Sequence, residues 1–242
     1  MGDTELLAAA PCSDLPRKRT RFAIVGFALL LWLIPSIAYA VIFTLHGPFL
    51  RANPWMEFLI VDSTLLSGSA LFLAWSRIPW LAAGVSWPQR SISWVPKIGA
   101  LLAIQLIGSI LLFAWNAPDT ASSSLSLGER FLLIWVFVPI SEEVFCRGWF
   151  QTAYLRAIGS GRGKSAVFAS AAFFALMHVF VSTSPLRIAV TVIAAFLSGL
   201  IYARARQESA SLLPGILMHS AFNFSGWLLA KPLWFLVSKL QR

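Results

Sequence analysis

Seven residues in three apolar stretches of the chain have types and spacings that could support hydrolytic chemistry. They form the patterns E-E-x-x-x-R at Glu142, Glu143 and Arg147, F-x-x-x-H at Phe174 and His178, and H-x-x-x-N at His219 and Asn223. In a helix, residues four positions apart lie on one face, so each pattern presents its side chains together. Ionisable side chains at membrane depth cost about 2.5 to 3.5 kcal/mol each on insertion scales, so each one calls for a structural or chemical reason.

The two adjacent glutamates differ in their expected surroundings. Glu143 and Arg147 are i,i+4 neighbours and can form an ion pair, whereas Glu142 is turned about 100° away and has no cation nearby on its helix. A carboxylate shielded from water is a stronger base, which would suit Glu142 to take a proton from a water molecule. The alternative interpretation is a structural ion pair at a helix end, and the residues themselves leave both open.

Two of the chain's three histidines, His178 and His219, lie in separate apolar segments. A single membrane histidine is often a packing residue, but two beside a pair of glutamates favour a polar site. With a rise of 1.5 Å per residue in a core of about 30 Å, both histidines and Glu142 are expected near mid-membrane. Pro139, just before the glutamates, is expected to kink its helix and leave a backbone carbonyl available to water.

The elements that must position these residues are predicted from composition and hydropathy. The chain has 242 residues, of which 58% are hydrophobic and 12% charged, against about 25% charged in a soluble domain. Long apolar runs predict an all-α, polytopic membrane helical bundle of about seven transmembrane helices, within a range of six to eight. The predicted spans are 22–44, 54–75, 95–115, 131–150, 165–181, 186–202 and 212–230. The terminal stretch 233–240 is too short to span and is predicted to lie in the interface.

The domain organisation is a polar basic N-terminal tail over residues 1–21, followed by a single membrane domain over 22–242. Within that domain, residues 131–227 contain all three patterns. The net charge of +9 could suggest a nucleic-acid partner, but the basic residues cluster between apolar runs, as expected for topology signals. Their distribution predicts a cytoplasmic N-terminus and no nucleic-acid partner. The compact chain and its short loops favour a multi-pass protein of a bacterial inner membrane. A cleaved signal peptide ending near Ala38-Tyr39-Ala40 is the alternative for the first run.

The three patterns, in this order, resemble the motifs of the CAAX prenyl protease and bacteriocin-processing family. This family, also called the abortive-infection family, consists of intramembrane glutamic endopeptidases. Gly148 after the arginine and the stretches 196–202 and 213–219 are also similar to family sequences. The resemblance covers about residues 131–227, under half of the chain, and implies that these residues form the catalytic core. The first three predicted spans match only as generic membrane helices.

The resemblance implies a role for each matched residue. Glu142 would be the general base that activates a water molecule, and His178 would help to hold that water. His219 and Asn223 would donate hydrogen bonds to the oxyanion of the tetrahedral intermediate. Glu143, Arg147 and Phe174 would have structural or substrate-orienting roles. The implied partners are the lipid bilayer and a membrane-associated protein or peptide, whether prenylated, sorted at its C-terminus, or a leader peptide, and no oligomeric state is predicted.

Three alternatives to this interpretation remain open from the sequence. A zinc ion held by Glu142, His178 and His219 would be a known catalytic arrangement. Asn223 favours a site without a cofactor or metal, because an amide is a poor zinc ligand and a good oxyanion donor. A proton-coupled transporter would use Glu142, His178 and Asp62 as a relay, and a membrane immunity or scaffold protein would keep the fold without catalysis. The protease interpretation leaves Asp62 and Glu57 without a role.

Overall fold

The computed structural model describes residues 55–76, 78–114, 125–158, 163–179 and 184–240, together with Gly26, Leu30 and Asn53. Within these residues every regular element is a helix, and none of them is in a strand. The predicted all-α fold class is therefore confirmed. The N-terminal tail over 1–21 and nearly all of the first predicted span, 22–44, lie outside the described residues, so both stay predictions.

The helices follow most of the predicted spans closely. The long helices are α3 (Trp55–Trp75), α4 (Trp94–Ala114), α8 (Gly163–Met177), α9 (Pro185–Ser209) and α10 (Leu213–Leu240). Between α4 and α8 lies a helical stretch of successive segments: α5 (Leu127–Leu132), η2 (Leu133–Phe137), α6 (Val138–Glu143), η3 (Val144–Gln151) and α7 (Thr152–Ile158). Of these, η2 and η3 are π-helical.

Three of the predicted spans have boundaries that differ from the structure by more than five residues. The sixth span, predicted over 186–202, continues as α9 to Ser209. The fourth segment, predicted over 131–150, begins at Leu127 and continues as helix to Ile158. The terminal stretch 233–240, predicted as a separate interfacial segment, is instead part of α10. Lys231 and Pro232 interrupt the apolar pattern there, but a proline inside a helix removes only one backbone donor and does not have to end it.

Within the described residues, three helices are long and apolar enough to cross a membrane, namely α3, α4 and α9. The helix α8 is apolar but has only 15 residues. The helix α10 has 28 residues, and its apolar character is diluted by polar residues that include His219 and Asn223. The chain is an integral membrane protein, and the total of seven spans remains a prediction.

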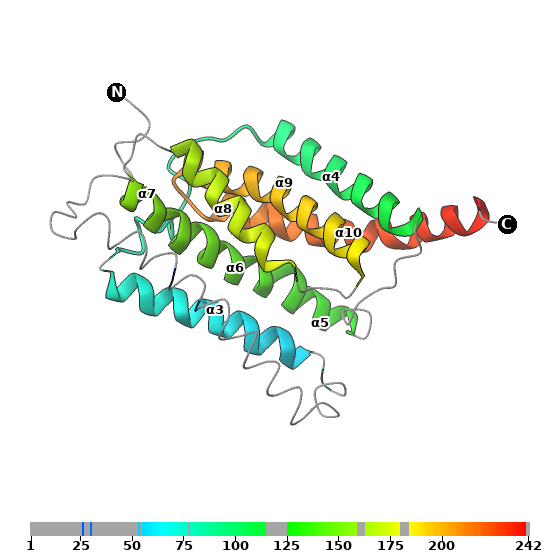
Figure 1. Cartoon of the computed structure of the whole chain (residues 1–242), viewed down its shortest axis with the longest axis horizontal. Coiled ribbons are helices and arrows are strands. Elements are labelled where there is room, and N and C mark those ends of the chain that lie inside the picture. Colours follow the sequence, from blue (N-terminus) through cyan, green and yellow to red (C-terminus); the bar gives the residue numbers. More distant parts are fainter. Residues whose placement is uncertain are drawn as a thin grey trace.

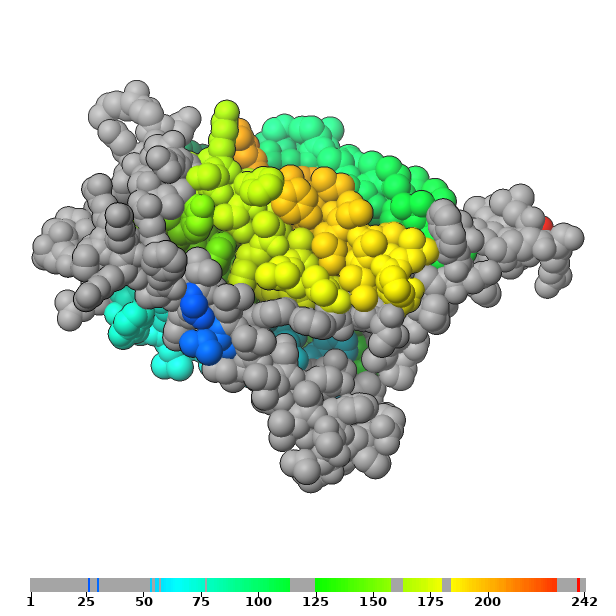
Figure 2. All heavy atoms as spheres, viewed as in Figure 1, coloured from blue at the N-terminus to red at the C-terminus, as the bar shows by residue number. Residues whose placement is uncertain are grey.

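The helices run lengthwise through the molecule, with the α5–α7 stretch in a central position (Figure 1). On one side this stretch packs against α3, and on the other it packs against α8 and α10. The helices α8 and α9 lie side by side along most of their length, as the space-filling view also shows (Figure 2). The helix α4 packs against α9 and α10, on the side of the bundle opposite α3. The residues of the central stretch are therefore surrounded by protein on two sides.

A short loop after α3 holds the turn between α9 and α10 in place. Arg206 Nη2 donates to the Ala82 carbonyl at 2.8 Å, and Leu212 N donates to the Gly84 carbonyl at 2.9 Å. Gly84 has a φ of +90°, a conformation that only glycine adopts at little cost. The site that a Cβ at Gly84 would occupy is filled by the Arg206 guanidinium. This loop fixes the beginning of α10, and with it the position of His219.

Replacing Gly84 with Ala should therefore destabilise the fold by about 1 to 3 kcal/mol, because the new side chain meets both backbone strain and Arg206. Thermal unfolding of the purified protein in detergent would measure the change. Gly99→Ala on α4 is the matched control, because an added Cβ there meets no atom within 4 Å. Equal unfolding temperatures for the two variants would contradict this account of the loop.

Candidate active site

The buried ion pair between Glu143 and Arg147 forms the centre of the candidate site. Arg147 Nη1 lies 2.9 Å from Glu143 Oε1, and both side chains are fully buried. Arg147 Nη2 also donates to the Gly199 carbonyl on α9 at 3.2 Å. The guanidinium lies 4.3 Å from the centre of the Phe174 ring on α8, a cation–π arrangement. The i,i+4 pair that the sequence allows therefore exists, and it joins the central stretch to two neighbouring helices.

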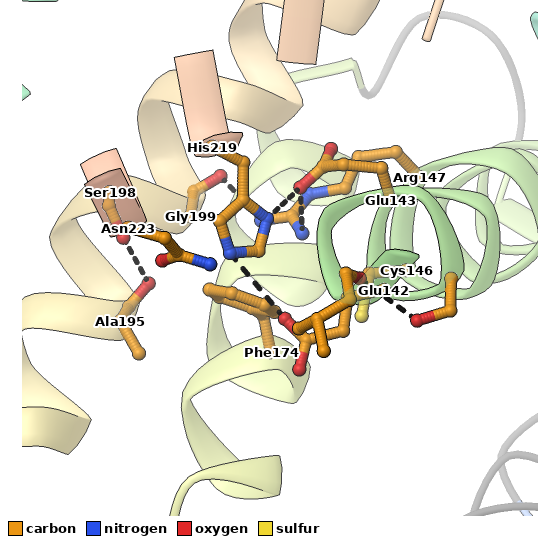
Figure 3. A network of polar contacts seen from close by, with 12 residues as sticks. Glu142, Glu143, Cys146, Arg147, Phe174, Ala195, Ser198, Gly199, His219 and Asn223 are labelled. Carbon is orange, nitrogen blue, oxygen red and sulfur yellow. Dashed lines mark hydrogen bonds and ion pairs between the residues drawn. The ribbon is translucent and has the colours of Figure 1, made fainter. Parts of the chain in front are cut away.

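His219 lies between the two glutamate carboxylates (Figure 3). Its Nδ1 is 3.3 Å from Glu143 Oε1, and its Nε2 is 3.6 Å from Glu142 Oε2. The imidazole is stacked on the Tyr202 ring with a centroid distance of 5.0 Å and meets the Phe174 ring edge to face at 5.5 Å. Two rings and two carboxylates thus fix both the position and the plane of His219.

The two glutamates have different environments despite being adjacent in sequence. The Glu143 side chain is fully buried, whereas the Glu142 side chain keeps 15% of its surface exposed. Glu143 shares one carboxylate oxygen with both Arg147 and His219. Glu142 Oε2 and Glu143 Oε2 are both buried without a hydrogen-bond partner among the described residues. The two acids differ in their charged neighbours, because Glu143 is held in an ion pair with Arg147, whereas the ion-pair partner of Glu142 within the described residues is His219.

Two glycines allow the helices to approach closely around the ion pair. A Cβ at Gly215, one turn before His219 on α10, would lie 2.8 Å from Glu143 Oε2. A Cβ at Gly199 on α9 would lie 3.2 Å from Arg147 Nη2 and from the backbone of Ala171. Both distances are shorter than ordinary van der Waals contacts, so larger residues at these positions would separate the helices.

Asn223 binds a backbone carbonyl that the central stretch leaves without a donor. In η2, the Val138 N–H reaches the Leu133 carbonyl, five residues back, in the π-helical manner. The next residue, Pro139, has no N–H to offer to the Ile134 carbonyl. Asn223 Nδ2 donates to that carbonyl at 3.0 Å. The carbonyl expected to be available because of Pro139 is therefore bound by Asn223, whose amide has a second hydrogen left to donate.

His178 lies just beyond the end of α8 and is held by its own helix. Its Nδ1 is 2.8 Å from the Phe174 carbonyl, and its ring meets the Phe174 ring at 4.7 Å. Because a carbonyl only accepts hydrogen bonds, Nδ1 must carry a proton, and in the neutral ring Nε2 is then an acceptor. Within the described part of the chain, no hydrogen bond or ion pair joins His178 to Glu142 or His219.

The structure therefore gathers Glu142, Glu143, Arg147, Phe174 and His219 into one cluster, with Asn223 one turn further along α10. Among the described side chains, no group of three or more His, Cys, Asp and Glu is arranged to hold a metal ion. The side chain of Glu57 lies outside the described residues.

Sequence reasoning missed two contributors to this cluster, Tyr202 and Ser141, and gave a third, Asp62, no role in the protease. Tyr202 stacks on His219 and is fully buried. The sequence feature that could have indicated it is its position at the end of a predicted span, as one of three tyrosines in the chain. Asp62 and Ser141 lie behind the glutamates and are hydrogen-bonded to each other. Asp62 was noticed as a membrane acid without a role, whereas Ser141 gave no signal because serine is common in membrane helices.

Comparison with known proteins finds a family model that matches the part of the chain containing this site. Residues 125–225 match the family model of the Type II CAAX prenyl endopeptidase Rce1-like proteins. The match extends from the start of α5 into α10 and includes all seven of the predicted site residues. No curated protein and no solved structure matches the chain.

The bond between Asn223 and Ile134 predicts a dependence on Pro139. Asn223→Ala should lower the free energy of unfolding by about 1 to 3 kcal/mol, because it leaves a carbonyl without a donor. In a Pro139→Ala background, residue 139 regains an N–H for the Ile134 carbonyl, so the same change should have a smaller effect. Chemical unfolding of the four proteins in detergent would give the coupling energy.

Ser225→Ala is the matched control on the same helix, because Ser225 Oγ donates only to the local Phe222 carbonyl at 2.9 Å. Its effect should be the same in both backgrounds. Equal costs of Asn223→Ala with Pro139 and with Ala at that position would show that the hydrogen bond does not replace the missing proline donor.

Proposed function

We propose that the chain, whose residues 125–225 match the family model of the Type II CAAX prenyl endopeptidase Rce1-like proteins, is an intramembrane endopeptidase of the glutamic type. The observation that carries the proposal is the partly exposed Glu142 carboxylate, whose Oε2 has no hydrogen bond within the described residues and lies 3.6 Å from His219 Nε2. A carboxylate in that state is suited to accept a proton from a water molecule as the water attacks a peptide carbonyl. The same proton then passes to the leaving amine, which returns Glu142 to its starting state.

The contacts of His219, Asn223 and His178 suggest a role for each of them in this reaction. The proposed reaction would use His219 Nε2 as a donor, while Glu143 Oε1 lies 3.3 Å from Nδ1 and orients the ring. Asn223 keeps one amide hydrogen after binding the Ile134 carbonyl. These two donors would stabilise the oxyanion, a contribution of about 2.7 to 4 kcal/mol for one donor in other proteases. His178 Nε2, an acceptor in the neutral ring, would hold the attacking water.

An apolar groove between α4 and α10 favours an apolar substrate segment. It has a volume of about 250 Å³, and its lining includes Trp94, Leu102, Met218 and Phe222. Met218 is adjacent in sequence to His219. The proposed substrates are therefore membrane-associated proteins or peptides, including prenylated proteins, proteins sorted at their C-terminus and leader peptides. The proposed location is a bacterial inner membrane, with the N-terminus in the cytoplasm.

Replacing Glu142 with Gln should reduce cleavage by about 100-fold to 10,000-fold while leaving the fold intact, because glutamine cannot accept the proton. The measurement is quantitative proteomics of membranes from cells that contain either the wild type or the variant. Uncleaved precursors should accumulate only with the variant. Unchanged precursor processing with Glu142→Gln would remove the general-base role.

Glu129→Gln is the matched control on the same helical stretch. Glu129 forms a capping box with Ser126 at the exposed start of α5, and glutamine can replace glutamate in a capping box. This variant should process precursors like the wild type. If cleavage were lost in Glu142→Gln while that variant still complemented a deletion strain, the cellular role would be non-catalytic.

Exhaustive chelation should leave cleavage unchanged, because the proposed mechanism draws its base and its oxyanion donors from side chains. The test combines precursor processing in chelator-treated membranes with elemental analysis of the purified protein. Loss of processing that zinc restores, together with one zinc ion per chain, would replace the glutamic mechanism with the zinc alternative.

A further inference from the structure

Asp62, on α3, is a buried acid behind the candidate site with no cation beside it. It is 3% exposed, and its hydrogen-bond partner is the hydroxyl of Ser141, the residue that precedes Glu142. Within the described residues, no Lys, Arg or His forms an ion pair with Asp62. A buried carboxylate without such a partner is expensive to keep charged.

The ionisable groups facing α3 add to this cost. The helix α3 packs against η2, α6 and η3. These carry Glu142 and Glu143 on α6, and Cys146 and Arg147 on η3, while η2 has no ionisable side chain. Arg147 forms its ion pair with Glu143. The negative charge of Glu142 disfavours a second negative charge on Asp62. Two neighbouring buried carboxylates do not both ionise readily, so one of the two is expected to hold a proton.

The hydrogen bonds around Ser141 indicate which of the two acids, Asp62 or Glu142, holds the proton. Ser141 Oγ is 2.9 Å from the Val138 carbonyl and is also within hydrogen-bond reach of Asp62 Oδ1. A hydroxyl has one hydrogen, and a carbonyl can only accept. Both contacts are hydrogen bonds if Asp62 donates its proton to Ser141 Oγ and Ser141 donates to Val138. If Asp62 were ionised, Ser141 could satisfy only one of the two acceptors at a time.

We propose that Asp62 is a positioning residue that stays protonated in the resting protein and donates to Ser141, so that Glu142 carries the negative charge of the pair. The inference rests on the proposed function for its catalytic meaning, because it assigns Asp62 the task of keeping Glu142 available as a base. Ser141 transmits the effect structurally, since its hydroxyl ties α3 to the turn of α6 that carries Glu142.

Infrared spectroscopy tests the protonation state without requiring activity. At neutral pH the wild type should show the C=O stretch of a protonated carboxylic acid, and Asp62→Asn should lack it. Ser141→Ala should keep the band at a shifted frequency, because the acid loses its hydrogen-bond acceptor. An absence of any difference in this band between the wild type and Asp62→Asn would overturn the proposal, whether or not the protein proves to be a protease.

The pH dependence of cleavage provides the second readout. Asp62→Asn is neutral and can still donate to Ser141, so the acidic limb of the profile should remain at the wild-type pH. If Asp62 were instead ionised in the wild type, the variant would remove a negative charge beside Glu142. The acidic limb would then move to lower pH by about one unit or more, which would also overturn the proposal.

Two further variants separate this role from packing. Ser69→Ala removes a buried hydroxyl of α3 that donates to the Leu65 carbonyl and has no carboxyl partner, so it should leave the band and the pH profile unchanged. Asp62→Leu removes the donor while filling the space, and should reduce cleavage more than Asp62→Asn does. Equal activity of the leucine and asparagine variants would show that the donor at position 62 has no positioning role.

Discussion

The ion pair between Glu143 and Arg147 is the interaction on which the arrangement of the site depends. A fully buried charge is tolerated when it is paired, and here further contacts to the pair come from other helices. The Gly199 carbonyl on α9, the Phe174 ring on α8 and His219 on α10 each contact one member of the pair. Displacing any of these helices would leave part of a buried charge uncompensated, so the pair determines how the helices converge.

The central helical stretch shows how a backbone irregularity can be stabilised by a neighbouring helix. The π-helical turn before Pro139 leaves the Ile134 carbonyl without a backbone donor, and Asn223 supplies one. Further along, Ser170 Oγ on α8 donates to the Cys146 carbonyl of η3 at 3.0 Å. Irregular turns of this kind are common at functional sites, because they redirect side chains that a regular α-helix would place elsewhere.

The cluster also distributes charge unevenly among three acids. Glu143 is paired with Arg147, and Asp62 is hydrogen-bonded to Ser141. Glu142 faces His219 through Oε2, an oxygen that has no hydrogen bond within the described residues. In a low-dielectric interior, an added charge acts strongly on its neighbours. The protonation of Asp62 and the basicity of Glu142 are therefore coupled, and the second glutamate of the sequence motif serves to hold the histidine that the first one faces.

The amino-acid sequence by itself determined the helical class, most helix positions and the division between a paired Glu143 and an available Glu142. These features depend on local spacing and hydropathy, which a single segment expresses without its neighbours. Only the tertiary structure decided that Tyr202 stacks on His219, that Asn223 binds Ile134, and that Asp62 lies behind Glu142. Each of these contacts joins residues far apart in the chain, and their partners are set by how the helices pack, which no periodicity within one helix encodes.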